Sequence, residues 1–583
     1  MLGHARLSII DLSSAGHQPM LDLETGNSIV YNGEIYNFQE QRDELVASGY
    51  QFHSNTDTEV LLALYRRYGV DCLERLRGMF AFAIWDESKR RLFMARDRVG
   101  KKPFAYALTP RGIVFSSEID PLVRHPLVDS TIDVEGLELY THLQCIPDPW
   151  TIYRSIRKLP PAHYALFDDK GFRIEEYWNI DYTQKLEISE EDALDTFDEK
   201  LREATKLRTI SDVPLGVLLS GGVDSSLIVA LMAQMQDTPV DTFSIGFSEK
   251  EFNELPYAQQ VADRYATNHH PKVLTPDVES LIDTIALRHG EPFADVSAVP
   301  SFYVCKAARQ HVTVALVGDG GDELLGGYAK YQLSPLGLRL SRALAPRTSP
   351  ENLARLIPSL IDDNSLPTKI RRRIIRRYLF PEIESHYKTP YFTDLVRARL
   401  LRQTRSGELG PSPLLENYRT LSLQKARVYA DEPIERMLWM DHHGYLASDL
   451  LPKMDIASMH CSLETRAPFL DHKVIEFCAS LPVHFKVRDR TGKYLLKKLA
   501  ERYLPREILY RRKMGFGIPL ADWLRGPLQT MARDLLNNSE LMAPLDSGVV
   551  QEELAAFYDR GEDHAARIWT LLMYAKWKEV SRA

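Results

Sequence analysis

Residues 218–226, LLSGGVDSS, place two glycines, an aspartate and three serines directly after an apolar run that predicts a buried strand. This composition fits either a tight strand-to-helix turn needed only for packing or a backbone cradle for a phosphate. A packing turn would not require Asp224, whose carboxylate repels phosphate unless a cation lies between them. No Lys-Ser or Lys-Thr follows the glycines, so the stretch is not a Walker A loop. It favours a phosphate site that takes Mg²⁺.

A second glycine-rich turn, GDGGDELLGGY at 318–328, follows another apolar run and carries Asp319, Asp322 and Glu323. Buried acids are costly unless they are paired, so this cluster suits metal–pyrophosphate binding better than packing. One such loop is a weak signal, but two loops on neighbouring strand-to-helix turns indicate one nucleotide site. In a parallel sheet that site lies beyond the carboxyl ends of the strands.

Residues 1–180 predict a layered β-sheet domain. Short apolar runs such as MFAFAIWD and RLFMARDR are separated by Gly, Asp and Asn turns. One helix is expected among them, TDTEVLLALYRRYG, with Thr56 or Asp57 as its cap and Gly69 as its stop.

A polar, acidic stretch at about 181–192 marks the expected boundary, and 193–583 forms the second domain. There the apolar runs PLGVLLS, 240–247 and 311–318 alternate with helical stretches, which predicts an α/β domain with a parallel sheet. Beyond 330 the chain is expected to be largely helical.

Charge and cysteine usage narrow the class of protein. The net charge of −8 disfavours nucleic acid or an anionic membrane as a partner, so the basic stretch KIRRRIIRRYL is interpreted as a solvated or acid-paired helix face. No window approaches the roughly 18 apolar residues of a membrane span, and we expect a cytoplasmic protein. The pairs His269-His270 and His442-His443 lack zinc-ligand spacing. No CxxC pair occurs, so reduced thiols are expected at Cys72, Cys145, Cys305, Cys461 and Cys478.

The stretch SGGVDSS resembles the PP-loop of the ATP pyrophosphatases, and GDGGDELLGGY narrows the resemblance to the asparagine synthetase branch. Residues 445–472 and RRKMGFGIP at 511–519 match the same family. YNGEIYN, TDTEVLL, LRGMFAFAIWD and ARDRVGKKPFAY match its class II glutamine amidotransferase (glutaminase) domain. The resemblance runs collinearly over nearly the whole chain. It implies an α+β glutaminase domain lacking its first strands, followed by an α/β PP-loop domain with a largely helical C-terminal part.

For the second domain, the resemblance implies that ATP activates a carboxylate, aspartate in the main family, as an acyl-adenylate that ammonia then attacks. Asp224 and Asp322 match metal-linked residues, and Asp319 stands where the family often has a glutamate tied to the intermediate. Lys513 matches a lysine that neutralises charge developing on the phosphates. The matched ATP-binding positions are Leu218, Ser220, Gly221, Gly222, Asp224, Ser225, Ile245, Val317 and Gly318.

For the first domain, the resemblance implies a glutamine site. Arg6 fits the α-carboxylate of glutamine, and Glu34 and Asp57 fit its α-ammonium group. Asn32 and Gly33 match an oxyanion hole, in which a side-chain amide and a backbone N–H stabilise a developing negative charge.

The sequence departs from this pattern at its start. The family's glutaminase attacks with an N-terminal cysteine whose free α-amine serves as the base, but this chain begins Met1-Leu2-Gly3 inside the matched domain. Cys72 cannot replace that residue, because its amine lies in a peptide bond. Either the natural start lies upstream or glutaminase activity has been lost, and the retained glutamine-site residues favour the first. We expect these 583 residues to use ammonia, and a longer form beginning Met-Cys-Gly to use both donors.

Three functions are compatible with the sequence. The first is an ATP- and Mg²⁺-dependent asparagine synthetase with aspartate, glutamine and ammonia as substrates and a homodimer as the candidate assembly. The second keeps the chemistry but changes the acceptor to a sugar acid, a peptide or an antibiotic precursor. The third is a non-catalytic binding or regulatory relative, which predicts decay of Asp224, Asp322 or Lys513. All three residues are present.

Overall fold

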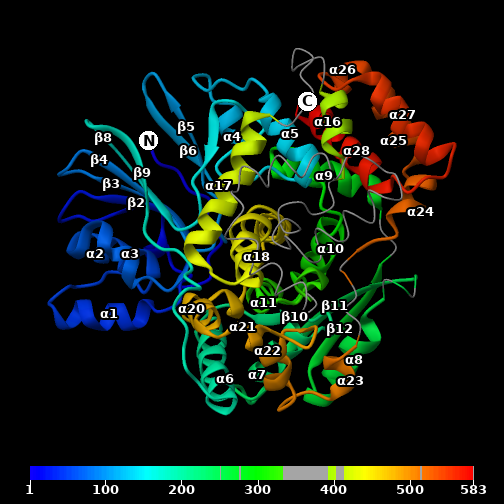
Figure 1. The fold of residues 1–583 in the computed structure, drawn as a ribbon. Coiled ribbons are helices and arrows are strands. Elements are labelled where there is room, and N and C mark those ends of the chain that lie inside the picture. The colour runs from blue at the N-terminus through cyan, green and yellow to red at the C-terminus, as the bar shows by residue number, and fades with distance from the viewer. Residues whose placement is uncertain are drawn as a thin grey trace.

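The computed structural model describes most of the chain, with gaps after residue 249 (Figure 1). The basic stretch at 369–379 and Lys513 lie outside the described residues. The described residues are 1–249, 251, 253–274, 277–332, 391–401, 412–511, 515 and 517–581.

The N-terminal domain contains two antiparallel sheets. The larger has the strand order β1-β2-β3-β4-β8-β9, and the smaller has the order β6-β5-β7. Their strands are β1 (Met20–Leu21), β2 (Ser28–Ile35), β3 (Gly78–Asp86), β4 (Arg91–Arg96), β5 (Ala105–Thr109), β6 (Gly112–Ser116), β7 (Ile156–Lys158), β8 (His163–Asp168) and β9 (Gly171–Glu176).

Alternation along β3 builds the two apolar layers of this domain. Phe80, Phe82 and Ile84 belong to the core that the large sheet shares with α2 (Asp57–Tyr68), whereas Ala81 and Ala83 belong to the core shared with the small sheet. The predicted helix is confirmed at α2. The Thr56 hydroxyl accepts from the Glu59 N–H at 3.2 Å, and Gly69 ends the helix at a φ of 61°.

The expectation of a single helix in this region was wrong. Two further ten-residue helices occur, α1 (Phe38–Ala47) and α5 (Val134–Leu143), along with the one-turn helices α3 (Cys72–Arg75) and α4 (Asp120–Val123). Helix α5 packs against the second domain, where the Tyr140 hydroxyl donates to the Thr570 carbonyl at 2.6 Å. The apolar face of α5 is therefore covered by residues far away in sequence.

The second domain is built on a five-stranded parallel sheet in the order β12-β11-β10-β13-β14. The three predicted strands are confirmed as β10, β11 and β13, whereas β12 and β14 were not foreseen. The bounds are β10 (Leu215–Leu218), β11 (Asp241–Phe247), β12 (Asn268–Leu274), β13 (Val314–Leu316) and β14 (Glu464–Arg466).

The strand order creates a switch point between β10 and β13. From β10 the chain moves outward through α7 (Val223–Ala233), β11 and α8 (Leu255–Tyr265) to β12. It then returns through α10 (Ala298–Ala308) to place β13 on the other side of β10. Connections of one hand put α7 and α8 on one face and α10 on the other. Both glycine-rich turns leave strands that flank this switch point, where open α/β sheets bind ligands.

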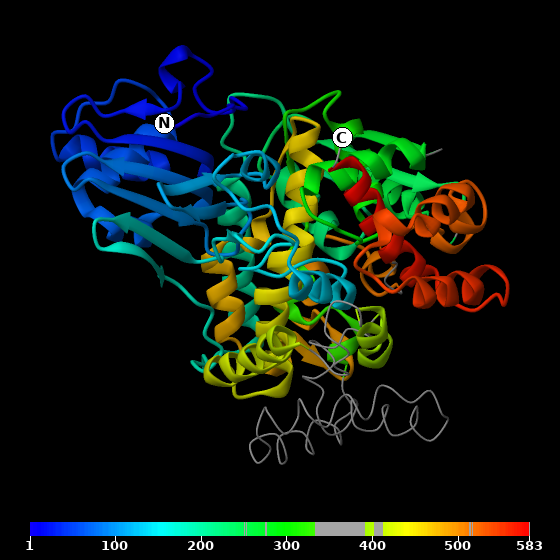
Figure 2. The same ribbon diagram turned by 90° about the horizontal axis from the view of Figure 1, so that it is seen from above.

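Helices dominate the rest of the domain, and Figures 1 and 2 both place α24–α28 on the side away from the N-terminal sheet. Between α18 and α19 the chain forms a π-helix over His442–Leu450. The short hairpin β15 (Val487–Arg488) and β16 (Thr491–Gly492) leads into α22. The remaining helices are α6 (Glu190–Leu207), α9 (Val278–His289), α11 (Gly321–Leu325), α16 (Asp394–Leu400), α17 (Pro413–Tyr429), α18 (Pro433–Asp441), α19 (Leu451–His460), α20 (His472–Ser480), α21 (Val483–Lys486), α22 (Tyr494–Ala500), α23 (Arg506–Leu509), α24 (Leu520–Arg525), α25 (Gln529–Asn537), α26 (Ser539–Met542), α27 (Ser547–Tyr558) and α28 (Ala565–Val580).

Candidate active site

A cavity of about 540 Å³ lies at the carboxyl edge of the parallel sheet. Residues that follow β10, β11 and β13 line it together, which is the arrangement expected at a switch point. Every ATP-site position proposed from the sequence except Gly221 is in its wall, as are Asp319 and Asp322: Leu218, Ser220, Gly222, Asp224, Ser225, Ile245, Val317 and Gly318.

The first turn is shaped by its own hydrogen bonds. The backbone N–H of Ser220 donates to the Ser225 hydroxyl at 3.2 Å, and that of Gly222 donates to the Ser220 hydroxyl at 3.3 Å. Gly221 has a φ of 70°, and a Cβ there would lie 2.6 Å from the Ala258 nitrogen, so a side chain cannot fit. Helix α7 begins directly after Gly222, and its first N–H groups are at the cavity, as an anion-binding turn requires.

The second turn packs tightly against the first. A Cβ at Gly318 would lie 2.8 Å from both the Asp224 Cβ and the Ser225 nitrogen, so the absence of a side chain allows the two turns to touch. This contact brings together two carboxylates that stand 98 positions apart, Asp224 on the first turn and Asp322 on the second. Both contact the same ammonium group, that of Lys493.

Lys493 lies directly before α22, and sequence reasoning missed it. Its Nζ is 2.5 Å from Asp224 Oδ2 and 2.8 Å from Asp322 Oδ1. Burial alone would lower the pKa of Lys493, but the two carboxylates outweigh burial and raise it above its usual value. A lone lysine ahead of a helix carries no spacing signal that could have identified it.

The two aspartates fit a divalent cation that is completed by phosphate oxygens. Their carboxylates already converge on one positive charge, and Mg²⁺ commonly takes one or two carboxylates together with substrate phosphates. Among the described residues there is no group of three or more His, Cys, Asp or Glu side chains arranged to hold a metal by itself. The site therefore suits a metal that arrives with a nucleotide.

Asp319 also lines the cavity, and its Oδ2 atom is buried with no hydrogen-bond partner among the residues that the structure describes. Two buried lysines, Lys453 and Lys101, interact electrostatically with the Asp319 carboxylate. Lys453 donates to Asp295 Oδ2 at 3.2 Å and to the Ser297 hydroxyl at 2.6 Å. Burial would lower its pKa, but the surrounding carboxylates, Asp319 among them, raise it.

The second of these lysines, Lys101, comes from the N-terminal domain. Its Nζ donates to the Thr465 hydroxyl at 3.1 Å, and burial lowers its pKa although the carboxylate of Asp319 opposes that shift. The carboxylate of Asp319 therefore interacts electrostatically with lysines from both domains.

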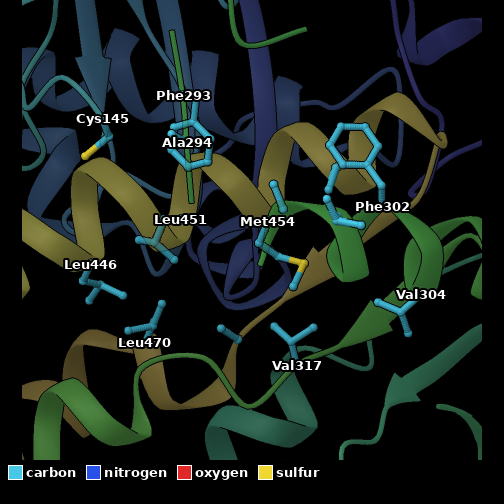
Figure 3. Packing of buried hydrophobic residues seen from close by; sticks show 14 of the residues in the cluster. Cys145, Phe293, Ala294, Phe302, Val304, Val317, Leu446, Leu451, Met454 and Leu470 are labelled. Atoms are coloured by element: carbon cyan, nitrogen blue, oxygen red, sulfur yellow. The ribbon is translucent and has the colours of Figure 1, made fainter. Parts of the chain in front are cut away.

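Apolar residues form part of the cavity wall. Leu218 and Ile245 are at the ends of β10 and β11, where they line the cavity as well as packing in the core. Figure 3 shows Met454 of α19 packed among Leu451, Phe302 and Val317, and of these residues Met454 and Val317 also line the cavity. An adenine ring would find a suitable surface here.

In the N-terminal domain, the proposed glutamine-site residues cluster around β2. Asn32, Gly33 and Glu34 are consecutive residues on that strand, and Asp57 begins α2 beside it. Asp57 Oδ2 accepts from the Tyr31 hydroxyl at 2.8 Å and from the Ile35 N–H at 2.9 Å.

Burial raises the pKa values of both acids in this cluster, Asp57 and Glu34. It raises the pKa of Asp57 to about 6 against the opposing effect of its hydrogen bonds. Burial, followed by the charges of Asp57 and Glu464, also raises the pKa of Glu34 well above its usual value. A positively charged ligand group would stabilise the ionised form of both carboxylates.

The hydrogen bonds of Arg6 go to other residues than those of this cluster. Its guanidinium donates to the carbonyls of Ile10 at 2.6 Å and Asp11 at 3.0 Å.

One buried arginine joins the two domains. The side chain of Arg466, on β14, is fully buried. It contacts Glu34 Oε1 at 3.5 Å and Glu464 Oε1 at 2.7 Å, and it also donates to the Arg208 carbonyl at 3.0 Å. The carboxylate of Glu34 in the N-terminal domain thus contacts a side chain of the parallel sheet. The local sequence SLETRAPFL gives no sign of this long-range contact.

Both domains of the chain match families of known proteins. Residues 196–579 match the family model for asparagine synthase, and residues 1–178 match that for a glutamine amidotransferase domain. The chain is 32% identical to asparagine synthetase [glutamine-hydrolyzing] 1 of Bacillus subtilis over 99% of its own length and 89% of that protein's. It is 34% identical to a putative asparagine synthetase [glutamine-hydrolyzing] of Mycobacterium bovis, over 100% and 89% of the two lengths.

The chain belongs to the asparagine synthase family.

A less similar relative carries a different name. Amidase chyE of Penicillium rubens is 26% identical, over 97% of this chain and 88% of that protein. The described part of the chain contains no helix that is both long and apolar enough to cross a membrane.

The cysteines of this asparagine synthase-family chain are poor nucleophiles where they stand. All five are internal, and four are buried while Cys461 is partly buried. Burial raises the thiol pKa of Cys72, Cys305, Cys461 and Cys478, which leaves little thiolate at neutral pH.

Proposed function

We propose that this protein is an ATP-dependent carbon–nitrogen ligase that converts aspartate to asparagine through an acyl-adenylate. One observation carries the proposal. Two glycine-rich turns flanking the switch point bring Asp224 and Asp322 onto a single cation position inside the cavity. Carboxylates, free helix N–H groups and an apolar wall in one cavity are what a metal-bound nucleotide triphosphate needs.

The roles follow from the chemistry of each group. The N–H groups after Gly221 and the hydroxyls of Ser220 and Ser225 bind pyrophosphate, and Leu218 and Ile245 flank the adenine. Val317 and Gly318 contact the nucleotide through their backbone. Asp224 and Asp322 hold Mg²⁺, which supplies charge neutralisation on the phosphates when bound.

Two further residues act on the reacting groups. Asp319 faces the activated carboxylate, with one oxygen free to accept a hydrogen bond. Lys513, outside the described residues, stabilises negative charge that grows on the leaving pyrophosphate.

The N-terminal domain provides a glutamine site in this proposal. Glu34 and Asp57 would take the α-ammonium group of glutamine, whose positive charge suits two buried acids with raised pKa values. Arg6 would take the α-carboxylate, and Asn32 and Gly33 would stabilise the oxyanion. The ligase site itself would take ammonia, either free or released from glutamine.

A second candidate keeps the adenylation and changes the acceptor. It is favoured by the collinear similarity to a protein named an amidase, which shows that chains of this architecture carry different names. A non-catalytic role ranks last, because Asp224 and Asp322 still converge on one cation position.

The test is pyrophosphate release by the purified full chain with ATP, Mg²⁺ and ammonium against a panel of carboxylates. We expect aspartate to give the highest kcat/KM, and Asp322→Asn to lower turnover at least ~100-fold while the fold survives. Preference for a sugar acid or peptide would favour the second candidate. An Asp322→Asn protein that releases pyrophosphate at the original rate would remove the site assignment.

A further inference from the structure

Lys493 occupies the position between the two metal-site carboxylates. Its ammonium group bridges Asp224 and Asp322, and the lysine side chain is only 6% exposed, against 18% and 16% for the two aspartates. A buried ammonium held by two carboxylates from different turns is a built arrangement, unlike a mobile surface ion pair.

The backbone around Lys493 is shaped to deliver it there. Lys493 adopts a left-handed backbone conformation at φ 56° and ψ 38°, and its N–H donates to the Leu325 carbonyl at 2.8 Å. Gly327 makes room for the side chain, because a Cβ at that position would collide with the Asp322 carboxylate and the Lys493 Cε. The hairpin before it turns at Asp489 and Arg490, both at positive φ, as a two-residue type I′ turn requires.

The positive charge of Lys493 affects which cations can bind between Asp224 and Asp322. Two adjacent, partly buried carboxylates without a cation would repel each other, and the ammonium of Lys493 lowers that repulsion. A free divalent cation entering the same position must displace the ammonium from at least one oxygen, and the positive charge of Lys493 opposes its binding. Nucleotide phosphates supply negative charge that offsets this repulsion, so a metal bound to phosphate meets less opposition.

We propose that Lys493 is a resident cation that holds Asp224 and Asp322 in register in the nucleotide-free protein and keeps free Mg²⁺ from binding there without nucleotide. The inference rests on the proposed ATP site but concerns the state before ATP binds. It makes the nucleotide-bound metal, rather than the free ion, the species that the site selects.

The test measures Mn²⁺ binding to the nucleotide-free full chain by electron paramagnetic resonance of the free ion. Lys493→Met keeps the volume of the side chain and removes its charge, so Mn²⁺ should bind at least roughly tenfold more tightly than to the wild type. Lys498→Met is the matched control: Lys498 also lies on α22, but it is not among the residues that line the cavity, and its ammonium pairs with Glu501 at 3.3 Å. This variant should change Mn²⁺ affinity by less than about twofold.

Two further arms keep the inference falsifiable if Lys493→Met does not fold. Lys493→Arg retains the cation and should leave Mn²⁺ binding as weak as in the wild type. The wild type should bind Mn²⁺ at least roughly tenfold more tightly with a non-hydrolysable ATP analogue than without it. Equal Mn²⁺ affinity in Lys493→Met and wild type, or tight Mn²⁺ binding by the nucleotide-free wild type, overturns the inference. Failure of the analogue to bind counts against the ATP site, whereas the Lys493 comparison is made without nucleotide.

Discussion

Asp57 shows how a single buried acid can make the stability of the protein depend on pH. Burial raises its folded pKa to about 6, above the ordinary 3.8, so the native state holds a proton that the unfolded state releases. This contribution to stability is fully present below about pH 4 and is lost as the pH rises through about 6. At about 1.4 kcal/mol per unit, the loss amounts to at most ~3 kcal/mol.

We expect Asp57→Asn to remove this dependence. The thermal midpoint of the wild type, relative to Asp57→Asn, should fall between pH 4 and pH 7, because only the wild type must ionise a buried carboxyl. Asp43→Asn, on the exposed side of α1, is the control and should track the wild type at every pH. A difference that stays constant across this range would mean that Asp57 titrates as an ordinary acid.

At the scale of elements, the two glycine-rich turns form one unit. Gly318→Ala should push them apart, because its Cβ would lie 2.8 Å from the Asp224 Cβ and the Ser225 nitrogen. We expect at least a ~10-fold loss of ATP affinity by calorimetry, at a stability cost of about 1–3 kcal/mol. Gly548→Ala, in α27 away from the cavity, meets only the flexible Asp546 carboxylate at 3.1 Å and should bind ATP normally. Normal ATP binding by Gly318→Ala would contradict the close packing of the turns.

These turns could be predicted because their signal is local: glycines and acids directly after an apolar run. Strand β12 could not, since it is an exposed edge strand that contains Pro271, and β14 has only three residues. Lys493 and Arg466 escaped prediction for a different reason. Each is defined by partners more than 160 positions away, and a single charged residue in a sequence says nothing about such partners.

At the scale of the whole molecule, the two domains share buried ion pairs. Lys102 contacts Asp455 at 2.9 Å, and Arg77 contacts Asp471 at 2.8 Å. Residues between 99 and 182 also belong to the same apolar core as the parallel sheet. The ligase site is therefore best studied in the full chain, because an isolated second domain would lose Lys101 and would separate Asp455 from Lys102, whereas Asp471 would keep only its second partner, Arg208, at 2.9 Å.

The use of ammonia can be tested on the whole polypeptide. Supplied with ATP, Mg²⁺ and aspartate, the 583 residues should form asparagine from ammonium, because ammonia itself attacks the activated carboxylate in the proposed reaction. Asparagine and AMP are quantified together, and a reaction without ATP serves as the control. ATP cleavage to AMP without formation of asparagine would show that ammonia is not the acceptor of the activated group.

The central claim is that a carboxylate attacks the α-phosphate of ATP in the cavity between the two turns. Aspartate labelled with oxygen-18 in its side-chain carboxylate tests this directly, with mass spectrometry of the products after reaction with ATP, Mg²⁺ and ammonium. An acyl-adenylate transfers one carboxylate oxygen to AMP, so we predict one label in AMP, none in pyrophosphate and one retained in asparagine. Label in inorganic phosphate with formation of ADP, or unlabelled AMP, would contradict the account.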